Sequence, residues 1–95
     1  MYALKKEPGK KPEWVDIESD LGPLQEAVGG YIETVTFDDF IVICDEEGRL
    51  KGKERNCRIE GISFVGTILI VGKGRDDFLS LPERVAYWLE WEEEL

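Results

Sequence analysis

Short runs in which apolar residues alternate with polar ones, or follow one another directly, recur along most of this chain. Both patterns are typical of β-strands when the runs are rich in β-branched and aromatic residues. They predict strands at residues 2–6, 13–17, 31–37, 40–44 and 64–71. Turn-forming residues separate the strands, with a Pro- and Gly-rich run at 8–12 and an acidic turn at 45–48. Residues 52–62 carry no clear pattern and are interpreted as loop.

Two further segments have apolar residues at the spacing of an amphipathic helix. The first covers about residues 20–29 and ends at Gly29. The second covers about residues 81–93, where Ser80 and Glu83 match the capping box that begins many helices. Its apolar stripe is expected to face the core and consists of Leu81, Val85, Trp88 and Leu89.

These elements predict an α+β fold, with a mostly antiparallel sheet of about four to six strands and both helices packed on one face of it. A chain of 95 residues is long enough for one domain with a two-layer core but not for two domains. We therefore expect a single domain over residues 1–95. The aromatic fraction of 11% favours a folded globule over a disordered acidic segment.

Charged residues are sorted into blocks along the chain. Between Trp14 and Glu47 there are ten acidic residues and no Lys or Arg, whereas residues 48–75 hold seven Lys and Arg against two Glu. Such sorting creates a dipolar surface field that steers encounters with charged partners. The net charge of −9 argues against direct contact with nucleic acid or with an anionic membrane. We expect the partner to be a protein.

Two groups of side chains are candidates for a partner surface. The acidic group lies in predicted turns and consists of Asp38, Asp39, Asp45, Glu46 and Glu47. The aromatic group is Tyr87 and Trp91, one turn apart on the predicted C-terminal helix. Partly exposed aromatic side chains are enriched in protein–protein interfaces. The same pair would also suit a position that covers the edge of a small hydrophobic core.

A candidate basic surface follows the acidic turn. Its cations recur at every second position, so an extended backbone would present all of them on one face: Arg49, Lys51, Lys53 and Arg55. Three interpretations fit this pattern. The cations would contact an acidic partner or phosphate, protect a strand edge from aggregation, or be neutralised by the acidic block of the same chain.

The residue types that usually carry catalysis are scarce in this chain. It has no histidine, and no Cys-x-x-Cys, Walker or dinucleotide-binding motif. The paired acids lie where turns are expected, and turn chemistry explains them without a reaction. Cys44 closes an apolar strand and is expected in the core, and both cysteines are expected to be free thiols. The sequence therefore predicts no enzyme, no metal and no cofactor.

Localisation is expected to be cytoplasmic. The first seven residues include Lys5, Lys6 and Glu7 and do not resemble a signal peptide. The longest apolar runs, at residues 40–44 and 68–71, are far too short to cross a membrane.

Four segments together resemble a small family of unknown function found in phages, conjugative elements and gut bacteria, mostly Firmicutes. They are PGKKPEWVDI (8–17), LQEAVGGYIE (24–33), CDEEGRL (44–50) and the tail GTILIVG…DDFLSL (66–81), and LQEAVGGYIE is the most specific of them. The chain departs from the family pattern at residues 53–59, where only Asn56 and Arg58 echo it. The resemblance implies no settled activity and no catalytic residues, but it favours a protein that binds host machinery.

The leading hypothesis is therefore a small acidic binding module that modulates a host protein, such as a nucleic-acid-binding or defence factor, through its acidic face. The first alternative is a self-associating structural protein, for example a homodimer in which Tyr87 and Trp91 are buried against the second copy and opposite charge blocks pair between the subunits. The second alternative is an enzyme that depends on carboxylates.

Overall fold

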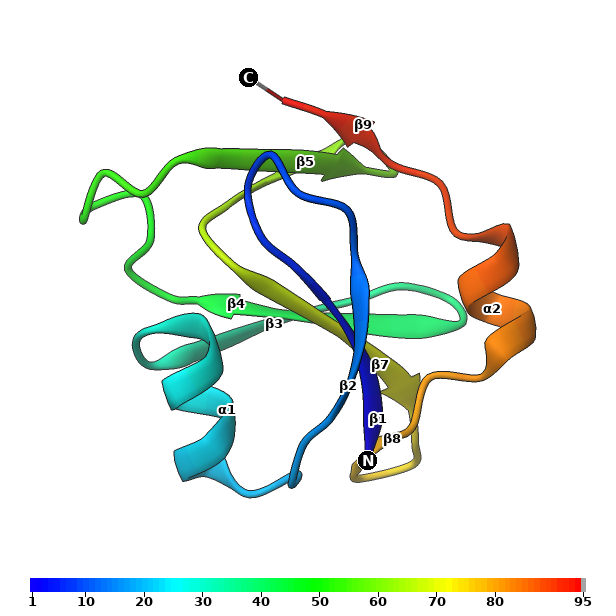
Figure 1. Ribbon diagram of the computed structural model, residues 1–95. Coiled ribbons are helices and arrows are strands. Elements are labelled where there is room, and N and C mark those ends of the chain that lie inside the picture. Colours follow the sequence, from blue (N-terminus) through cyan, green and yellow to red (C-terminus); the bar gives the residue numbers. More distant parts are fainter. Residues whose placement is uncertain (95) are drawn as a thin grey trace.

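The computed structural model describes residues 1–94, which form two antiparallel sheets and two short helices (Figure 1). The strands are β1 (Tyr2–Lys6), β2 (Glu13–Asp16), β3 (Ile32–Thr36), β4 (Phe40–Asp45), β5 (Arg55–Ile59), β6 (Ile62–Val65), β7 (Ile68–Lys73), β8 (Phe78–Leu79) and β9 (Glu92–Glu93). The helices are α1 (Leu21–Val28) and α2 (Glu83–Trp88). The α+β class and the antiparallel pairing that the sequence predicts are confirmed.

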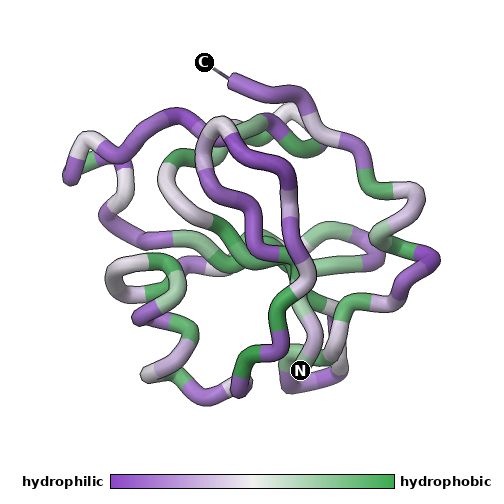
Figure 2. Tube along the Cα trace, viewed as in Figure 1, coloured by the Kyte–Doolittle hydropathy of each residue, from purple (hydrophilic) through white to green (hydrophobic). Residues whose placement is uncertain are grey.

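The larger sheet has the strand order β2-β1-β7-β4-β3, and β8 pairs with the end of β7. At its centre, β4 and β7 pair from Phe40 opposite Gly72 to Ile43 opposite Leu69. Every residue of β4 is buried, and so is every residue of β7 except the last. Strands that are covered on both faces read as continuous apolar runs, and Figure 2 shows hydrophobic positions concentrated in these central strands.

One face of the larger sheet packs against α1. Successive side chains of a strand point to opposite faces, so alternate residues of β1, β4 and β7 share this side. The buried cluster here consists of Ala3, Ile41, Ile43, Leu69 and Val71 from the sheet and Leu24 and Val28 from α1.

The other face packs against the smaller sheet, whose strand order is β6-β5-β9, and against α2. The buried cluster on this side contains Leu4, Phe40, Val42, Cys44, Ile68 and Ile70 of the larger sheet, with Cys57, Ile59, Phe64 and Leu81. In Figure 1, β5 and β9 lie above the larger sheet and α1 lies below it. The prediction that both helices pack on one face is therefore wrong.

The segments at 52–62 and 64–71 also differ from the prediction. Residues 55–59 form β5 instead of a loop, and the predicted strand at 64–71 is divided between β6 and β7. The alternation in β5 is obscured by an irregularity in its pairing with β6 between Arg55 and Cys57, which shifts the register by one residue. A shift of this kind breaks the period of two on which a strand is recognised in a sequence.

A buried lysine ties the C-terminal strand to the rest of the fold. The side chain of Lys6 is 1% exposed, and its Nζ lies 2.9 Å from Oε1 of Glu93 in β9. Nearby, Nδ2 of the buried Asn56 donates hydrogen bonds to the carbonyl oxygens of Lys6 (2.8 Å) and Gly66 (2.7 Å). These contacts hold the smaller sheet against the end of β1, because a buried cation or amide requires its partners in place.

Both thiols are expected to be unreactive in the folded protein. Burial raises the pKa of Cys44 and of Cys57 to about 11, so the thiolate fraction at pH 8 is small. We predict that Ellman's reagent modifies the native protein at least about 100-fold more slowly than the urea-unfolded protein, whose thiols have a pKa near 8.5. Rapid modification of either thiol without unfolding would contradict the buried positions of these residues.

Candidate functional site

The predicted C-terminal helix is much shorter than expected, and a cleft lies beside its early end. The hydroxyl of Ser80 does not cap α2, because it accepts a hydrogen bond from the backbone N–H of Tyr2 (2.8 Å). After Trp88 the chain becomes extended and continues to β9, which pairs with β5. Glu90 and the three Glu residues at 92–94 would lie near the negative end of a longer helix, which disfavours its extension.

The apolar stripe predicted for this helix is only partly correct. Leu81 is buried, and Val85 and Leu89 are half-buried against the core as expected. Trp88, in contrast, is 76% exposed. Its indole meets the ring of Tyr87, which is 80% exposed, in an edge-to-face contact with centroids 5.3 Å apart.

Tyr87 and Trp91 consequently do not form the predicted pair. Trp91 lies beyond the end of the helix, is half-buried and packs against the core. Of the two interpretations left open by the sequence, core cover fits Trp91 and rim exposure fits Tyr87. The prediction that Trp88 faces the core is wrong, because the spacing of the apolar stripe assumes a helix that continues to residue 93 and α2 ends at Trp88.

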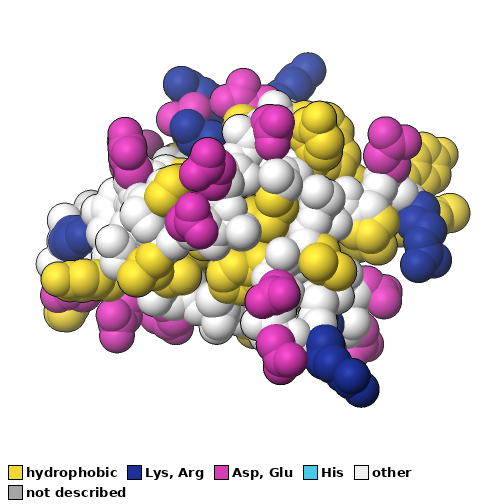
Figure 3. All heavy atoms as spheres, turned by 90° about the horizontal axis from the view of Figure 1, so that it is seen from below, with side chains coloured by type: hydrophobic (Ala, Val, Ile, Leu, Met, Phe, Trp, Pro, Cys, Tyr) yellow, Lys and Arg dark blue, Asp and Glu magenta, His cyan; other side chains and the backbone are white. Residues whose placement is uncertain are grey.

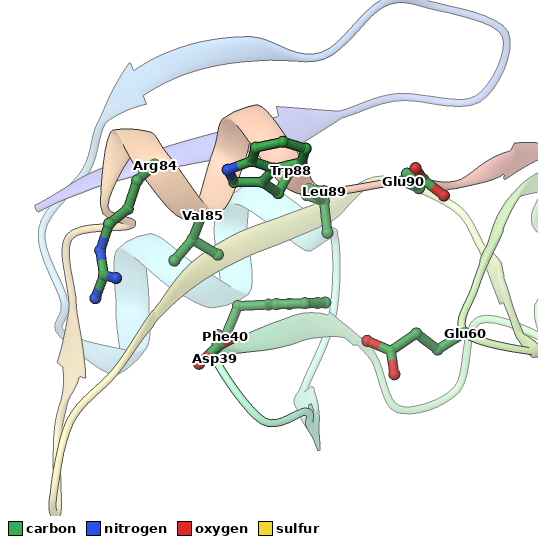
Figure 4. A pocket seen from close by; sticks show the side chains of 8 residues that line it. All are labelled: Asp39, Phe40, Glu60, Arg84, Val85, Trp88, Leu89 and Glu90. Atoms are coloured by element: carbon green, nitrogen blue, oxygen red, sulfur yellow. The ribbon is translucent and has the colours of Figure 1, made fainter.

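A cleft of about 490 Å³ lies between α2 and the turns that precede β4 and follow β5. Its lining residues are Asp39, Phe40, Glu60, Arg84, Val85, Trp88, Leu89 and Glu90. Figure 4 shows Val85 of α2, and Leu89 just after the helix, pointing toward the ring of Phe40. The Phe40 ring is itself held by stacking on Phe37, with centroids 4.8 Å apart. The cleft therefore has an apolar floor supported by the core.

The rim of the cleft is mainly acidic. Asp39, Glu60 and Glu90 come from three separate segments of the chain, and Arg84 contributes the single positive charge of the lining. Within residues 1–94, none of the three carboxylates forms a salt bridge with another side chain. The carboxylate of Glu60 points into the space below α2 in Figure 4.

Glu60 is positioned by a tight turn. Glu60 and Gly61 connect β5 and β6, with φ angles of 46° and 83°. Positive φ at both central residues is the signature of a type I′ hairpin, in which Asn-Gly is the most favourable pair and Glu is unusual. A non-glycine residue in this conformation raises the free energy of the folded state, so it persists only where the surrounding fold holds it. The fold thereby places the charge of Glu60 at the mouth of the cleft.

An exposed indole, an apolar floor and a ring of carboxylates together suit one kind of ligand. The aliphatic stem of Lys or Arg packs on apolar surface, while its charged end prefers carboxylates or the face of an aromatic ring. The arrangement can therefore hold a cationic side chain.

The predicted acidic surface is divided by the structure. Asp38 and Asp39 lie exposed at the turn between β3 and β4, and Asp39 lines the cleft. Glu46 and Glu47 are exposed at the opposite end of β4. Seen from the side of α1, Asp and Glu side chains are spread over the face with hydrophobic ones between them, and most Lys and Arg lie toward its edges (Figure 3).

Asp45 does not belong to an exposed surface, and its inclusion there is corrected. Its side chain is fully buried, and its Oδ2 lies 2.8 Å from Nζ of Lys51 and 2.7 Å from Nζ of Lys53. Its Oδ1 accepts a hydrogen bond from the backbone N–H of Glu47 at 2.9 Å. Burial alone would raise the pKa of Asp45, but the hydrogen bonds from the two lysines and from Glu47 outweigh it and hold the pKa well below its usual value.

The predicted basic surface is also corrected. Residues 46–52 form consecutive turns, so the four cations do not lie on one face of an extended strand. Lys51 and Lys53 point inward to Asp45 and donate hydrogen bonds to the carbonyl oxygens of Gly29 (3.1 Å) and Val28 (2.7 Å) at the end of α1. Neutralisation by the chain's own acidic block, one of the three interpretations, therefore applies to these two residues. Arg49 and Arg55 remain exposed.

The approach of Lys51 to Asp45 requires a glycine beside them. A Cβ atom on Gly30 would lie 2.6 Å from Oδ1 of Asp45 and 2.6 Å from Nζ of Lys51. The Gly29-Gly30 sequence that ends α1 therefore also makes room for the buried ion pairs.

A family model for a domain of unknown function, DUF3846, matches residues 1–93. The chain belongs to this family. No curated protein and no solved structure matches the chain at a significant level. Membership extends over nearly the whole sequence.

Two further observations concern the described part of this DUF3846 protein. Over residues 1–94, no group of three or more Cys, Asp or Glu side chains is placed to hold a metal ion. Neither α1 nor α2 is long and apolar enough to cross a membrane.

We predict that Asp45→Asn lowers the free energy of unfolding by about 2–3 kcal/mol, because two lysines lose their buried anion. The pKa of Asp45 is depressed on folding, so its stabilising contribution is present above its unfolded pKa of about 3.9 and is lost as the pH falls. Urea titrations should therefore show the difference between the wild type and Asp45→Asn narrowing below about pH 4.

The matched control is Glu46→Gln, which removes one negative charge from the neighbouring exposed position. It should change stability by no more than about 0.5 kcal/mol. Equal effects of the two substitutions would contradict the structural role of Asp45.

Proposed function

We propose that this protein is a binding module that takes a basic segment of a protein partner into the cleft beside α2. The observation that carries the proposal is that Asp39, Glu60 and Glu90, from three separate segments, line one cleft together with the exposed Trp88. Elsewhere on the chain, Asp45 satisfies its charge with lysines of its own fold, whereas these carboxylates have no such partner within residues 1–94.

The energetics of the cleft favour a Lys or Arg side chain over a neutral one. The apolar floor formed by Phe40, Val85 and Leu89 offers surface to the aliphatic stem. A cation over an indole gains about 0.5–2 kcal/mol, depending on its desolvation. The net charge of −9 adds long-range attraction, which speeds association with a basic partner and weakens as salt is added.

The biological setting of the proposal rests on the resemblance to proteins of phages and conjugative elements. In that setting, the partner is a host protein with a basic surface, such as a nucleic-acid-binding or defence factor, met in the cytoplasm. The net negative charge disfavours direct contact with nucleic acid or with an anionic membrane. The acidic module would compete for the surface with which such a factor holds its own anionic ligand.

We further propose that the role is binding without catalysis. The chain has no histidine, and the raised pKa values of Cys44 and Cys57 make both poor nucleophiles. The carboxylates of the cleft lie on exposed turns and at the end of a short helix.

The test is the binding of a fluorescent ten-residue peptide of alternating Arg and Gly, with a Ser-Gly peptide as the reference. We predict that Trp88→Ala and a double variant, Glu60→Asn with Glu90→Gln, each weaken binding of the Arg peptide about tenfold, equivalent to 1.4 kcal/mol. Asn suits the left-handed turn at residue 60, so the double variant removes charge while preserving the hairpin. Affinity for the Arg peptide should fall between about 50 and about 300 mM NaCl, because the Debye length shortens from roughly 14 Å to roughly 6 Å over this range.

The control variant is Glu26→Gln, which removes a charge from the exposed face of α1, on the far side of the larger sheet. It should bind the Arg peptide nearly as well as the wild type. The proposal fails if Trp88→Ala binds like the wild type, or if Glu26→Gln weakens binding as much as a charge removed from the cleft. If the peptide results support the proposal, affinity capture from host lysate with the wild type and the same variants would identify the natural partner.

A further inference from the structure

Strand β3 leaves one edge of the larger sheet unpaired. It is the last strand in the order β2-β1-β7-β4-β3, and in the described residues its only ladder is the one with β4. That ladder runs without interruption from Ile32 opposite Asp45 to Thr36 opposite Ile41. An unpaired edge presents a row of free backbone N–H and C=O groups, which can pair with another strand.

Two hydrogen bonds show which backbone groups of β3 are free. The carbonyl oxygen of Tyr31 accepts a hydrogen bond from the N–H of Glu46 (2.8 Å), and the N–H of Phe37 donates one to the carbonyl oxygen of Phe40 (2.9 Å). In an antiparallel ladder, alternate residues direct their backbone groups to the partner strand. The odd-numbered residues of β3 therefore pair with β4, and the backbone groups of Ile32, Thr34 and Thr36 point outward.

The β3 edge lacks the features by which proteins usually protect such edges. Residues 32–36 contain no Lys, Arg, Pro or Gly, only one charged residue, Glu33, and no bulge. The opposite edge of the same sheet differs: β2 carries a charge at each end, Glu13 and Asp16, and follows Pro12. The β3 edge is therefore the less protected of the two edges of this sheet.

We infer that the partner is a second copy of this chain, paired antiparallel through β3 about a two-fold axis at Thr34. In this register, Thr34 lies opposite Thr34 of the second copy, and Ile32 lies opposite Thr36. Both are hydrogen-bonded pairs, as the outward backbone groups require. The two sheets would become one continuous sheet across the axis. This inference goes beyond the proposed function, because neither Thr34 nor any other residue of β3 lines the cleft.

Side-chain chemistry supports this register. Glu33 falls opposite Val35 of the second copy, so no like charges lie directly opposite each other in the ladder. Tyr31, which is 66% exposed, falls opposite Phe37, and aromatic cross-strand pairs stabilise sheets. Beyond these pairs, Asp38 falls opposite Gly30 of the second copy.

The test uses the position on the two-fold axis, where a substitution meets its own copy. We expect the wild type to sediment as a dimer at 200 µM (a concentration that detects dissociation constants weaker than micromolar). Thr34→Lys and Thr34→Glu should each raise the dissociation constant of the dimer at least about tenfold, because like charges directly opposite each other destabilise a sheet. An equimolar mixture of the two variants should recover the dimer, since Lys then faces Glu.

Recovery in the mixture separates this register from any other mode of association. Thr34 is exposed and its N–H is not used by β4, so both variants should keep the wild-type circular dichroism. Glu13→Lys, at the opposite edge of the sheet, is the control and should remain dimeric. A monomeric wild type at 200 µM, a Thr34→Lys variant that stays dimeric, or a mixture that stays monomeric would each overturn the inference. Peptide binding by the monomeric variants would leave the cleft proposal standing.

Discussion

The rest of the fold depends on covering two central strands from both sides. Because β4 and β7 are buried on both faces, the larger sheet needs a cover above and below it. The helix α1 supplies one cover with Leu24 and Val28, and the smaller sheet with α2 supplies the other. A chain of 95 residues must form the larger sheet and the elements that cover both of its faces, so many of these elements are short.

Burial of β4 along its whole length carries a charge into the interior. Asp45 ends this strand, and its carboxylate is neutralised by Lys51 and Lys53, which also reach the carbonyl groups at the end of α1. One buried anion thereby links the sheet, the helix and the turns at 46–52. Such an arrangement is destabilising unless every partner is in place, so it specifies one packing of these three parts.

The cleft exists because the smaller sheet and α2 do not completely cover their face of the larger sheet. After Trp88 the chain leaves the helix to add β9 to the smaller sheet, where Lys6 pairs with Glu93. The floor of the cleft is part of the core, whereas its rim is formed by turns and by the end of α2. Core residues hold the floor rigid, and the charged rim is free to make contacts outside the fold.

The sequence by itself determined the α+β class, the strands β1 to β4, the short helix α1 and the burial of Cys44, because each depends on a local pattern of polarity. The sequence also predicted that Asp39 lies on the surface, and the structure places this residue in the lining of the cleft. It did not give Trp88, Glu60 or Glu90, nor the inward direction of Asp45, Lys51 and Lys53. Only the tertiary structure decided these, because they depend on contacts between distant segments. The pairing of β9 with β5 ends α2, and the position of α1 beside residues 51–53 directs Lys51 and Lys53 to the buried carboxylate of Asp45. The spacing of apolar residues indicates which face of a strand or helix is buried, but it does not indicate which other element packs against that face.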